Sequence, residues 1–125
     1  MTKLLTLAAL VGLALASTSK RTVNASWYGP KYDGRPTASG AIFDHRKLTC
    51  ASWDYPMGTK LRLRHGPRFV VVEVNDRGPA KRLLGTRQID LSLGAFRRLA
   101  DPASGIIKNV EITVIKKGNK HASQR

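Results

Sequence analysis

The sequence predicts a small all-β domain, built as a barrel or a sandwich of short strands. Short stretches in which apolar and polar residues alternate recur along the chain, and turns rich in glycine and proline separate them. The chain has no long amphipathic helix. Several short strands with little helix are typical of barrels and sandwiches, between which periodicity alone does not decide.

The first strands follow from the alternation of residue types. Residues 23–28 predict a strand, and residues 29–40, rich in Gly, Pro, Ser and Thr, predict a loop after it. Residues 60–65 place leucines on one face and cations on the other. After a Gly-Pro turn, residues 69–75 place alternate valines on one face, so the two segments predict a β-hairpin.

The second half of the chain adds a short helix between two strands. Residues 87–92 predict a short strand, and residues 92–100 carry apolar side chains at helical spacing before an Asp-Pro pair ends the helix. Asp90 is expected to cap this helix. Residues 108–115 alternate again and predict the last strand.

The N-terminus predicts export. Residues 1–16 combine a lysine, an uncharged apolar run and the small-residue end Ala14-Leu15-Ala16, which is typical of a cleaved signal peptide. The apolar run is shorter than the roughly 20 residues that cross a bilayer, so no transmembrane helix is expected. No cysteine follows the cleavage site closely, which argues against a lipoprotein. We expect the protein in the periplasm, the cell wall or the extracellular space.

The net charge of the chain indicates which class of partner it binds. The chain has 22 Lys and Arg against 8 Asp and Glu, a net charge of +14, and such a surface attracts polyanions. In an exported protein these are anionic wall or envelope polymers or anionic lipid, and nucleic acid is not expected.

Cys50 is the single cysteine, so no intramolecular disulfide forms, and we expect a buried, inert thiol. A monomer is expected.

Three acids in irregular segments are the candidates for chemistry: Asp33, Asp44 and Asp76. Functional side chains concentrate in loops, but an aspartate there also forms turns through bonds to the backbone, and both interpretations stay open. The histidines show no ligand spacing, so no metal or other cofactor is expected. The chain has no nucleophile elbow and no phosphate-binding glycine loop. Aromatic residues near the loops either stack on sugar rings or pack the barrel ends.

Three segments together resemble the RlpA-like (rare lipoprotein A) family. They are ASWYGPKYDGRPTASGAIFD (25–44), YPMGTKLRLRHG (55–66) and VVVEVNDRGP followed by QIDLS, in matching order and spacing. The resemblance implies a six-stranded double-psi β-barrel with one or two short helices, related at a distance to expansins. It also implies an exported protein that acts on peptidoglycan, with lytic transglycosylase activity in the best-known members.

The resemblance divides the chain and suggests site residues. The expected parts are a signal peptide (1–16), a leader (17–24), the barrel (25–115) and a basic disordered tail (116–125). The expected catalytic residues are Asp76 and Asp44. Expected substrate-binding residues are Trp27, Tyr28, Thr37, Ser39, Ser52 and Arg77. Two positions depart from the family pattern, since Ala41 stands in place of a glutamate and Ser52 in place of a histidine.

These departures leave two functions open. A lytic transglycosylase uses the sugar's own C6 hydroxyl as nucleophile, so one residue can act as acid and then as base, and Asp76 could fill that role. The alternative is a non-catalytic, expansin-like module that binds wall glycan, which the missing acid at Ala41 favours. Arg77 either pairs with Asp76 or binds an anionic group of the substrate. In both cases the expected partner is the peptidoglycan glycan strand.

Overall fold

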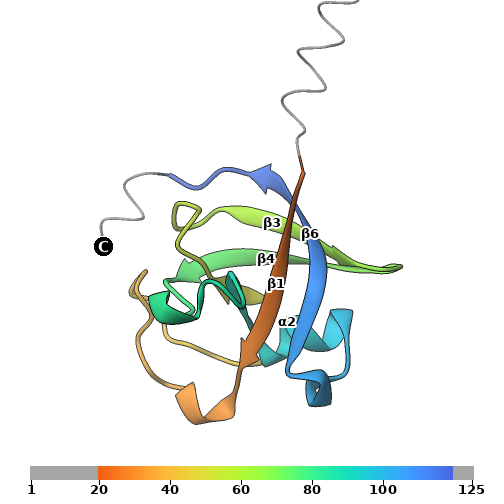
Figure 1. Ribbon diagram of the computed structural model, residues 1–125. Helices are drawn as coiled ribbons and strands as arrows, with labels where there is room; N and C mark the ends of the chain where they lie inside the picture. Colours follow the sequence, from red (N-terminus) through yellow and green to blue (C-terminus); the bar gives the residue numbers. More distant parts are fainter. Residues whose placement is uncertain (1–19, 120–125) are drawn as a thin grey trace, which may run out of the picture.

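The computed structural model describes residues 20–119, which form a closed barrel of six strands (Figure 1). The order of strands around the barrel is β1-β5-β2-β4-β3-β6. The strands are β1 (Arg21–Tyr28), β2 (Thr49–Ala51), β3 (Lys60–His65), β4 (Arg68–Asp76), β5 (Ile89–Ser92) and β6 (Ile106–Lys116). The prediction of a small all-β fold is confirmed, and closure of the sheet decides for the barrel. Strand β2 was not predicted.

The barrel mixes parallel and antiparallel pairs. β1 pairs with β5 and β2 with β4 in parallel, while the other neighbours are antiparallel. The predicted hairpin is β3 and β4, joined at Gly66. Alternate residues of these strands fill the interior, so that Leu61, Leu63 and Val72 are almost completely buried. The inward set follows the period of two that the sequence predicted.

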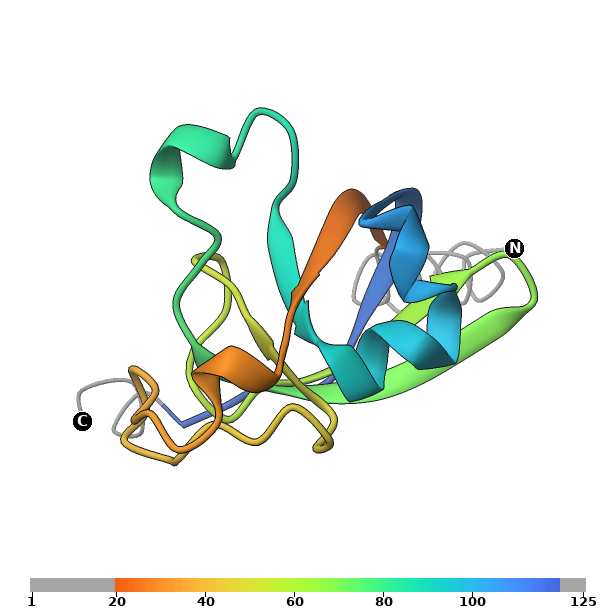
Figure 2. The same ribbon diagram turned by 90° about the horizontal axis from the view of Figure 1, so that it is seen from below.

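One α-helix and three short 3₁₀ helices complete the described chain. They are η1 (Pro30–Tyr32), η2 (Lys81–Leu83), α2 (Leu93–Leu99) and η3 (Pro102–Ser104). Figures 1 and 2 show α2 packed across one end of the barrel, where it buries Phe96 completely. Ser92 caps α2, because its Oγ accepts a hydrogen bond from the N–H of Ala95 at 3.2 Å. The prediction that Asp90 caps this helix was wrong, since Asp90 lies within β5.

The ends of the barrel differ slightly from the predicted boundaries. β1 begins at Arg21, so residues 21–24 of the expected leader belong to the barrel, where they pair with β6. β6 ends at Lys116, one residue into the expected tail. The predicted signal peptide and the last residues of the predicted tail lie outside the described residues. Between residues 20 and 119, every helix is too short or too polar to cross a membrane.

Candidate functional site

Two carboxylates lie in one row across four neighbouring strands. Ser26 of β1 pairs with Asp90 of β5, Asp90 pairs with Ala51 of β2, and Ala51 pairs with Asp76 of β4. Residues next to this row, such as Leu91, are fully buried and point into the core. Because side chains alternate along a strand, the row faces outward. Asp90 and Asp76 are thus two strand spacings apart, about 10 Å between their Cα atoms.

A β-bulge places Asp76 in this row. Cys50 pairs with Val74, yet the next residue of β2, Ala51, pairs with Asp76, so Asn75 is the extra residue on β4. Val74 points inward and is completely buried. Without the bulge, alternation would turn Asp76 inward as well, and the extra residue reverses its direction.

Asp90 is a half-buried carboxyl with a raised pKa. Burial is the largest cause, and the negative charge of Asp76 adds to it. A hydrogen bond from Ser26 Oγ to Asp90 Oδ1 and the positive charge of Arg87 oppose the shift. The Nε of Arg87 lies 3.8 Å from Asp90 Oδ1. A carboxyl that keeps its proton above the usual range is suited to general-acid chemistry.

Asp76 is held by the backbone, and Arg77 does not pair with it through its side chain. Asp76 Oδ1 accepts from the N–H groups of Ala38 at 3.0 Å and Arg77 at 2.8 Å. The Arg77 guanidinium donates instead, through Nη1, to the carbonyls of Ser52 at 2.7 Å and Tyr55 at 2.8 Å. Neither alternative given for Arg77 describes this contact, which anchors the loop between β2 and β3.

The two carboxylates line a cleft of two adjoining pockets. The larger pocket, about 480 Å³, is lined by Trp27, Tyr28, Gly29, Pro30, Lys31, Tyr32, Arg87 and Asp90. The smaller, about 230 Å³, is lined by Tyr28, Tyr32, Ala51, Asp76, Arg77, Gly78, Pro79, Ala80 and Asp90. Tyr28, Tyr32 and Asp90 line both pockets, so they form the junction. Such concave, aromatic-lined volumes with a few polar groups are typical of ligand sites.

Tyr28 lines this junction and carries a buried hydroxyl. Its oxygen is buried and has no hydrogen-bond partner in the described chain. Burial raises the pKa of Tyr28 above its ordinary value, and the charges of Asp76 and Asp90 add to this shift. The hydroxyl therefore keeps its proton, while the rest of the side chain lines the cleft.

Trp27 both packs the barrel end and lines the cleft. Its Nε1 donates to the carbonyl of Pro102 at 3.0 Å, and its ring lies 6.5 Å from the ring of Phe96. The same side chain lines the larger pocket. The two interpretations of the aromatic residues therefore both apply to Trp27, whose fixed ring offers a stacking surface to a sugar.

Three expected substrate-binding residues do not line the cleft. Thr37 Oγ1 lies 2.9 Å from Ser39 Oγ and donates to the carbonyl of Ala41 at 2.7 Å, so both hydroxyls fold the loop that contains them. Ser52 is buried, and its Oγ accepts from the N–H of Asp54 at 3.1 Å. These side chains shape the loops around Asp76, and their place as ligand contacts has no support in the lining of either pocket.

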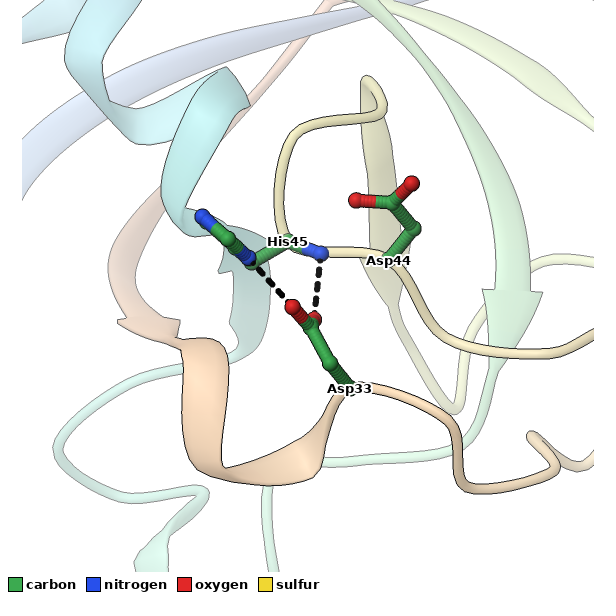
Figure 3. Close-up of side chains that lie close together, drawn as sticks. All are labelled: Asp33, Asp44 and His45. Carbon is green, nitrogen blue, oxygen red and sulfur yellow. Dashed lines mark hydrogen bonds and ion pairs between the residues drawn. The ribbon is translucent and has the colours of Figure 1, made fainter.

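Asp44 lies with Asp33 and His45, outside the lining of both pockets (Figure 3). Asp33 accepts from the backbone N–H of His45 at 2.7 Å and lies 2.6 Å from its Nδ1. Asp44 binds the backbone and guanidinium of Arg46, and these bonds lower the pKa of Asp44 to about 2. The structure therefore does not bring Asp44 together with Asp76.

The Asp33, Asp44 and His45 group is the one place, within residues 20–119, where potential metal ligands converge within 4.8 Å of one another. Sequence spacing did not indicate it, because Asp33, the residue after η1, lies more than ten residues before the other two. Figure 3 shows the carboxylates of Asp33 and Asp44 on opposite sides of the backbone that joins Asp44 to His45. The hydrogen bonds to His45 and Arg46 occupy both carboxylates, so the group is explained by loop structure.

Sequence reasoning missed Asp90, Arg87 and Lys31 as cleft residues. Of these three, Asp90 had the clearest signal of a functional residue in the sequence, because it is a single acid between apolar neighbours on a short strand. Cys50 conforms to its prediction, since it is completely buried and burial raises the pKa of its thiol. An inert thiol follows.

Comparisons with known proteins point in one direction. A family model described as lytic transglycolase matches residues 20–112. The chain is 43% identical over 106 residues to the probable endolytic peptidoglycan transglycosylase RlpA of Synechocystis sp., covering 81% of this chain and 32% of that protein. It is 39% identical over 100 residues to the endolytic peptidoglycan transglycosylase RlpA of Campylobacter jejuni, covering 78% and 35%. The chain thus spans about a third of the length of the curated relatives it matches.

Solved structures with the same fold are more distant in sequence. The Streptomyces papain inhibitor has a TM-score of 0.62 and 23% identity, covering 78% of this chain and 96% of that chain. A mutant expansin from Clavibacter michiganensis in complex with cellohexaose has a TM-score of 0.63 and 17% identity, covering 81% and 52%. At these identities the likeness concerns the fold alone.

Proposed function

The chain belongs to the lytic transglycolase family of RlpA-like double-psi β-barrels, and from this membership and the acidic cleft we propose that it cleaves peptidoglycan glycan strands as an endolytic transglycosylase. The observation that carries the proposal is the outward row in which Asp90 and Asp76 line one aromatic cleft. About two strand spacings separate the two acids, which leaves room for a sugar ring between them.

The proposed reaction needs one residue that acts first as acid and then as base. Asp90 donates its proton to the glycosidic oxygen as the bond from this oxygen to C1 breaks. The C6 hydroxyl of the same sugar attacks C1, and its proton passes to Asp90, so a 1,6-anhydro end forms and no water is consumed. Asp76 stabilises the positive charge that develops at C1, as carboxylates do in glycosidases.

The missing family acid at position 41 does not remove this pair. Ala41 is exposed, and its N–H and carbonyl serve the loop bonds to Ser39 and Thr37. It lines neither pocket of the cleft. Our proposal assigns the acid to Asp90, whereas the sequence led us to expect that Asp76 acts as acid and then as base. The second candidate, a glycan-binding module without cleavage, keeps the same cleft and is favoured by the loss of an acid at Ala41.

A direct assay separates the two candidates. The full chain is incubated with purified glycan strands, and the products are analysed by mass spectrometry for 1,6-anhydromuramyl ends. We expect such ends to accumulate with time and with protein concentration. Strands that are bound but stay intact at high protein concentration would exclude cleavage and leave the binding module as the function.

Export and a second contact with anionic wall or envelope polymers complete the proposal. The hairpin of β3 and β4 carries exposed cations on its outer face, among them Arg62 and Arg64. Neither forms an ion pair within the described part of the chain, although Arg62 lies 4.9 Å from the ring of Phe69. Unpaired cations on one face attract a polyanion at a distance of a Debye length or less.

The double variant Arg62→Gln/Arg64→Gln is expected to weaken binding to isolated cell walls about threefold to tenfold at low salt. The difference should disappear at high salt, because mobile ions screen exposed charges. A pull-down at two salt concentrations measures it. The control Arg97→Gln/Arg98→Gln removes the same charge from exposed positions on α2. Equal loss in both variants would show that net charge, and not the hairpin face, drives binding.

A further inference from the structure

The larger pocket of the cleft combines two cations with aromatic walls. Lys31 and Arg87 line it together with Trp27 and Tyr32, and Asp90 stands where it meets the smaller pocket. Its volume of about 480 Å³ is in the range of pockets that hold small ligands. A neutral sugar would need the aromatic walls but not the two cations.

Arg87 has unused donors that the fold does not satisfy. Its Nε is buried, and no hydrogen-bond acceptor for it is present in the described chain. Asp90 Oδ1, at 3.8 Å, is too far for a hydrogen bond. No other side-chain bond of Arg87 is found between residues 20 and 119, while its side chain stays 26% exposed. The exposed part of the side chain is therefore left to meet a ligand, and an anion in the pocket would form charge-assisted hydrogen bonds with this part of the guanidinium.

Lys31 supplies a second cation to the lining of the pocket. It belongs to η1, and its Nζ lies 5.1 Å from the centre of the Tyr32 ring. Within the described residues it has no carboxylate partner. Many cations of this basic chain also lack a carboxylate partner, so the informative fact is that Lys31 and Arg87 line the same pocket from separate elements.

We propose that the larger pocket is a carboxylate subsite, in which Arg87 and Lys31 bind a carboxylate borne by the glycan strand next to the cleaved bond. The proposal rests on the proposed function, because it takes the strand as the ligand. Peptidoglycan offers this chemistry from two sources. One is the lactyl carboxylate of a muramyl residue without a peptide, and the other is a free carboxylate of an attached peptide.

The subsite would also link substrate recognition to the acid. Four groups face Asp90: Ser26 and Tyr28 from β1, Asp76 from β4, and Arg87 from the loop before β5. Arg87 is the cation among them, and it opposes the raised pKa of Asp90. A carboxylate bound to Arg87 weakens this opposition, so a strand that carries the anion keeps Asp90 in its acid form.

Binding measurements by calorimetry at neutral pH test the subsite separately from cleavage. Three short muramyl glycans serve as ligands: one with free lactyl carboxylates, one in which these are neutral methyl amides, and one with peptides whose carboxylates are free. We expect the native chain to bind a carboxylate-bearing glycan about tenfold more tightly than the amide. Lys31→Gln/Arg87→Gln should lose this preference and leave the affinity for the amide unchanged. The control Arg98→Gln/Lys108→Gln removes equal charge outside both pockets and should keep the preference.

The ligands and variants distinguish every outcome. Tighter binding of the first glycan identifies the lactyl carboxylate as the source, and tighter binding of the third identifies the peptide. Equal affinity of the native chain for all three ligands would overturn the subsite, even if strands are cleaved. The subsite would also be overturned if the Lys31→Gln/Arg87→Gln variant lost as much affinity for the methyl amide as for the carboxylate-bearing glycans, because the pocket would then bind only the sugar. A carboxylate preference without any 1,6-anhydro ends would instead support the subsite and contradict the transglycosylase.

Discussion

Replacing Asp90 by asparagine is expected to reduce the rate of strand cleavage by about 10²- to 10⁴-fold, the usual contribution of a general acid. The asparagine keeps the shape of the side chain and an oxygen that accepts the bond from Ser26, but it has no acidic proton to transfer to the glycosidic oxygen. Affinity for the glycan should change little. Release of 1,6-anhydro ends, measured by mass spectrometry over time, gives the rate.

The same variant should remain folded, which separates this prediction from a stability effect. Because the pKa of Asp90 is raised in the folded protein, its charge opposes folding as the pH rises from the ordinary aspartate value through the raised one. Asparagine carries no charge, so thermal stability at neutral pH should be equal to that of the native chain or higher. The control Asp54→Asn makes the same change at a half-exposed residue that pairs with Arg21 and should leave cleavage intact. Cleavage that survives in Asp90→Asn would show that another group is the acid.

The pH profile of cleavage also tests the assignment of Asp90 as the general acid. The acid form of Asp90 is needed first, and its raised pKa keeps that form present above the ordinary aspartate range. Cleavage should therefore fall as the pH rises through the raised value. Ser26→Ala removes a bond that favours the charged form, so the falling limb should move to higher pH.

Replacing Phe96 by alanine is expected to destabilise the fold by about 4 kcal/mol and to lower Tm by roughly 20 °C. Phe96 is the largest completely buried side chain among residues 20–119, and it joins α2 to the barrel. Its loss leaves a cavity that the neighbouring helix and strands cannot close fully. Thermal unfolding followed by circular dichroism measures the change.

Phe69→Ala is the matched control, because the same ring is 57% exposed on β4. It should shift Tm by only a few degrees. A small effect of Phe96→Ala, comparable with that of Phe69→Ala, would mean that α2 contributes little to the core. Since Trp27 packs against Phe96, residual folded protein should also bind glycan more weakly.

Most of the strands could be predicted from the sequence because the alternation that indicates a strand lies within a few consecutive residues. Alternation over 60–65 and 69–75 gave both members of the hairpin, and helical spacing gave α2. β2 has three residues, too few for a period to emerge, and its place between β4 and β5 is set by pairing with distant segments. A strand as short as β2 can be identified only from the strands with which it pairs.

The site was harder to predict because it depends on register. Asp76 was found from its loop motif, but its companion Asp90 was assigned to a helix cap that Ser92 forms. No spacing along the chain shows that Ala51 pairs with both acids, or that one extra residue at Asn75 turns Asp76 outward. Such pairings join residues far apart in sequence, so local patterns do not contain them.

The cross-strand row has a consequence for how such proteins diverge. The distance between Asp90 and Asp76 is fixed by backbone pairing to Ala51, whereas the cations of the larger pocket belong to η1 and to the loop before β5. The loops can therefore lengthen, shorten or exchange charges without moving the reactive groups. Natural selection or protein engineering could therefore change which glycan strand is accepted by substituting loop residues, while the barrel stays the same.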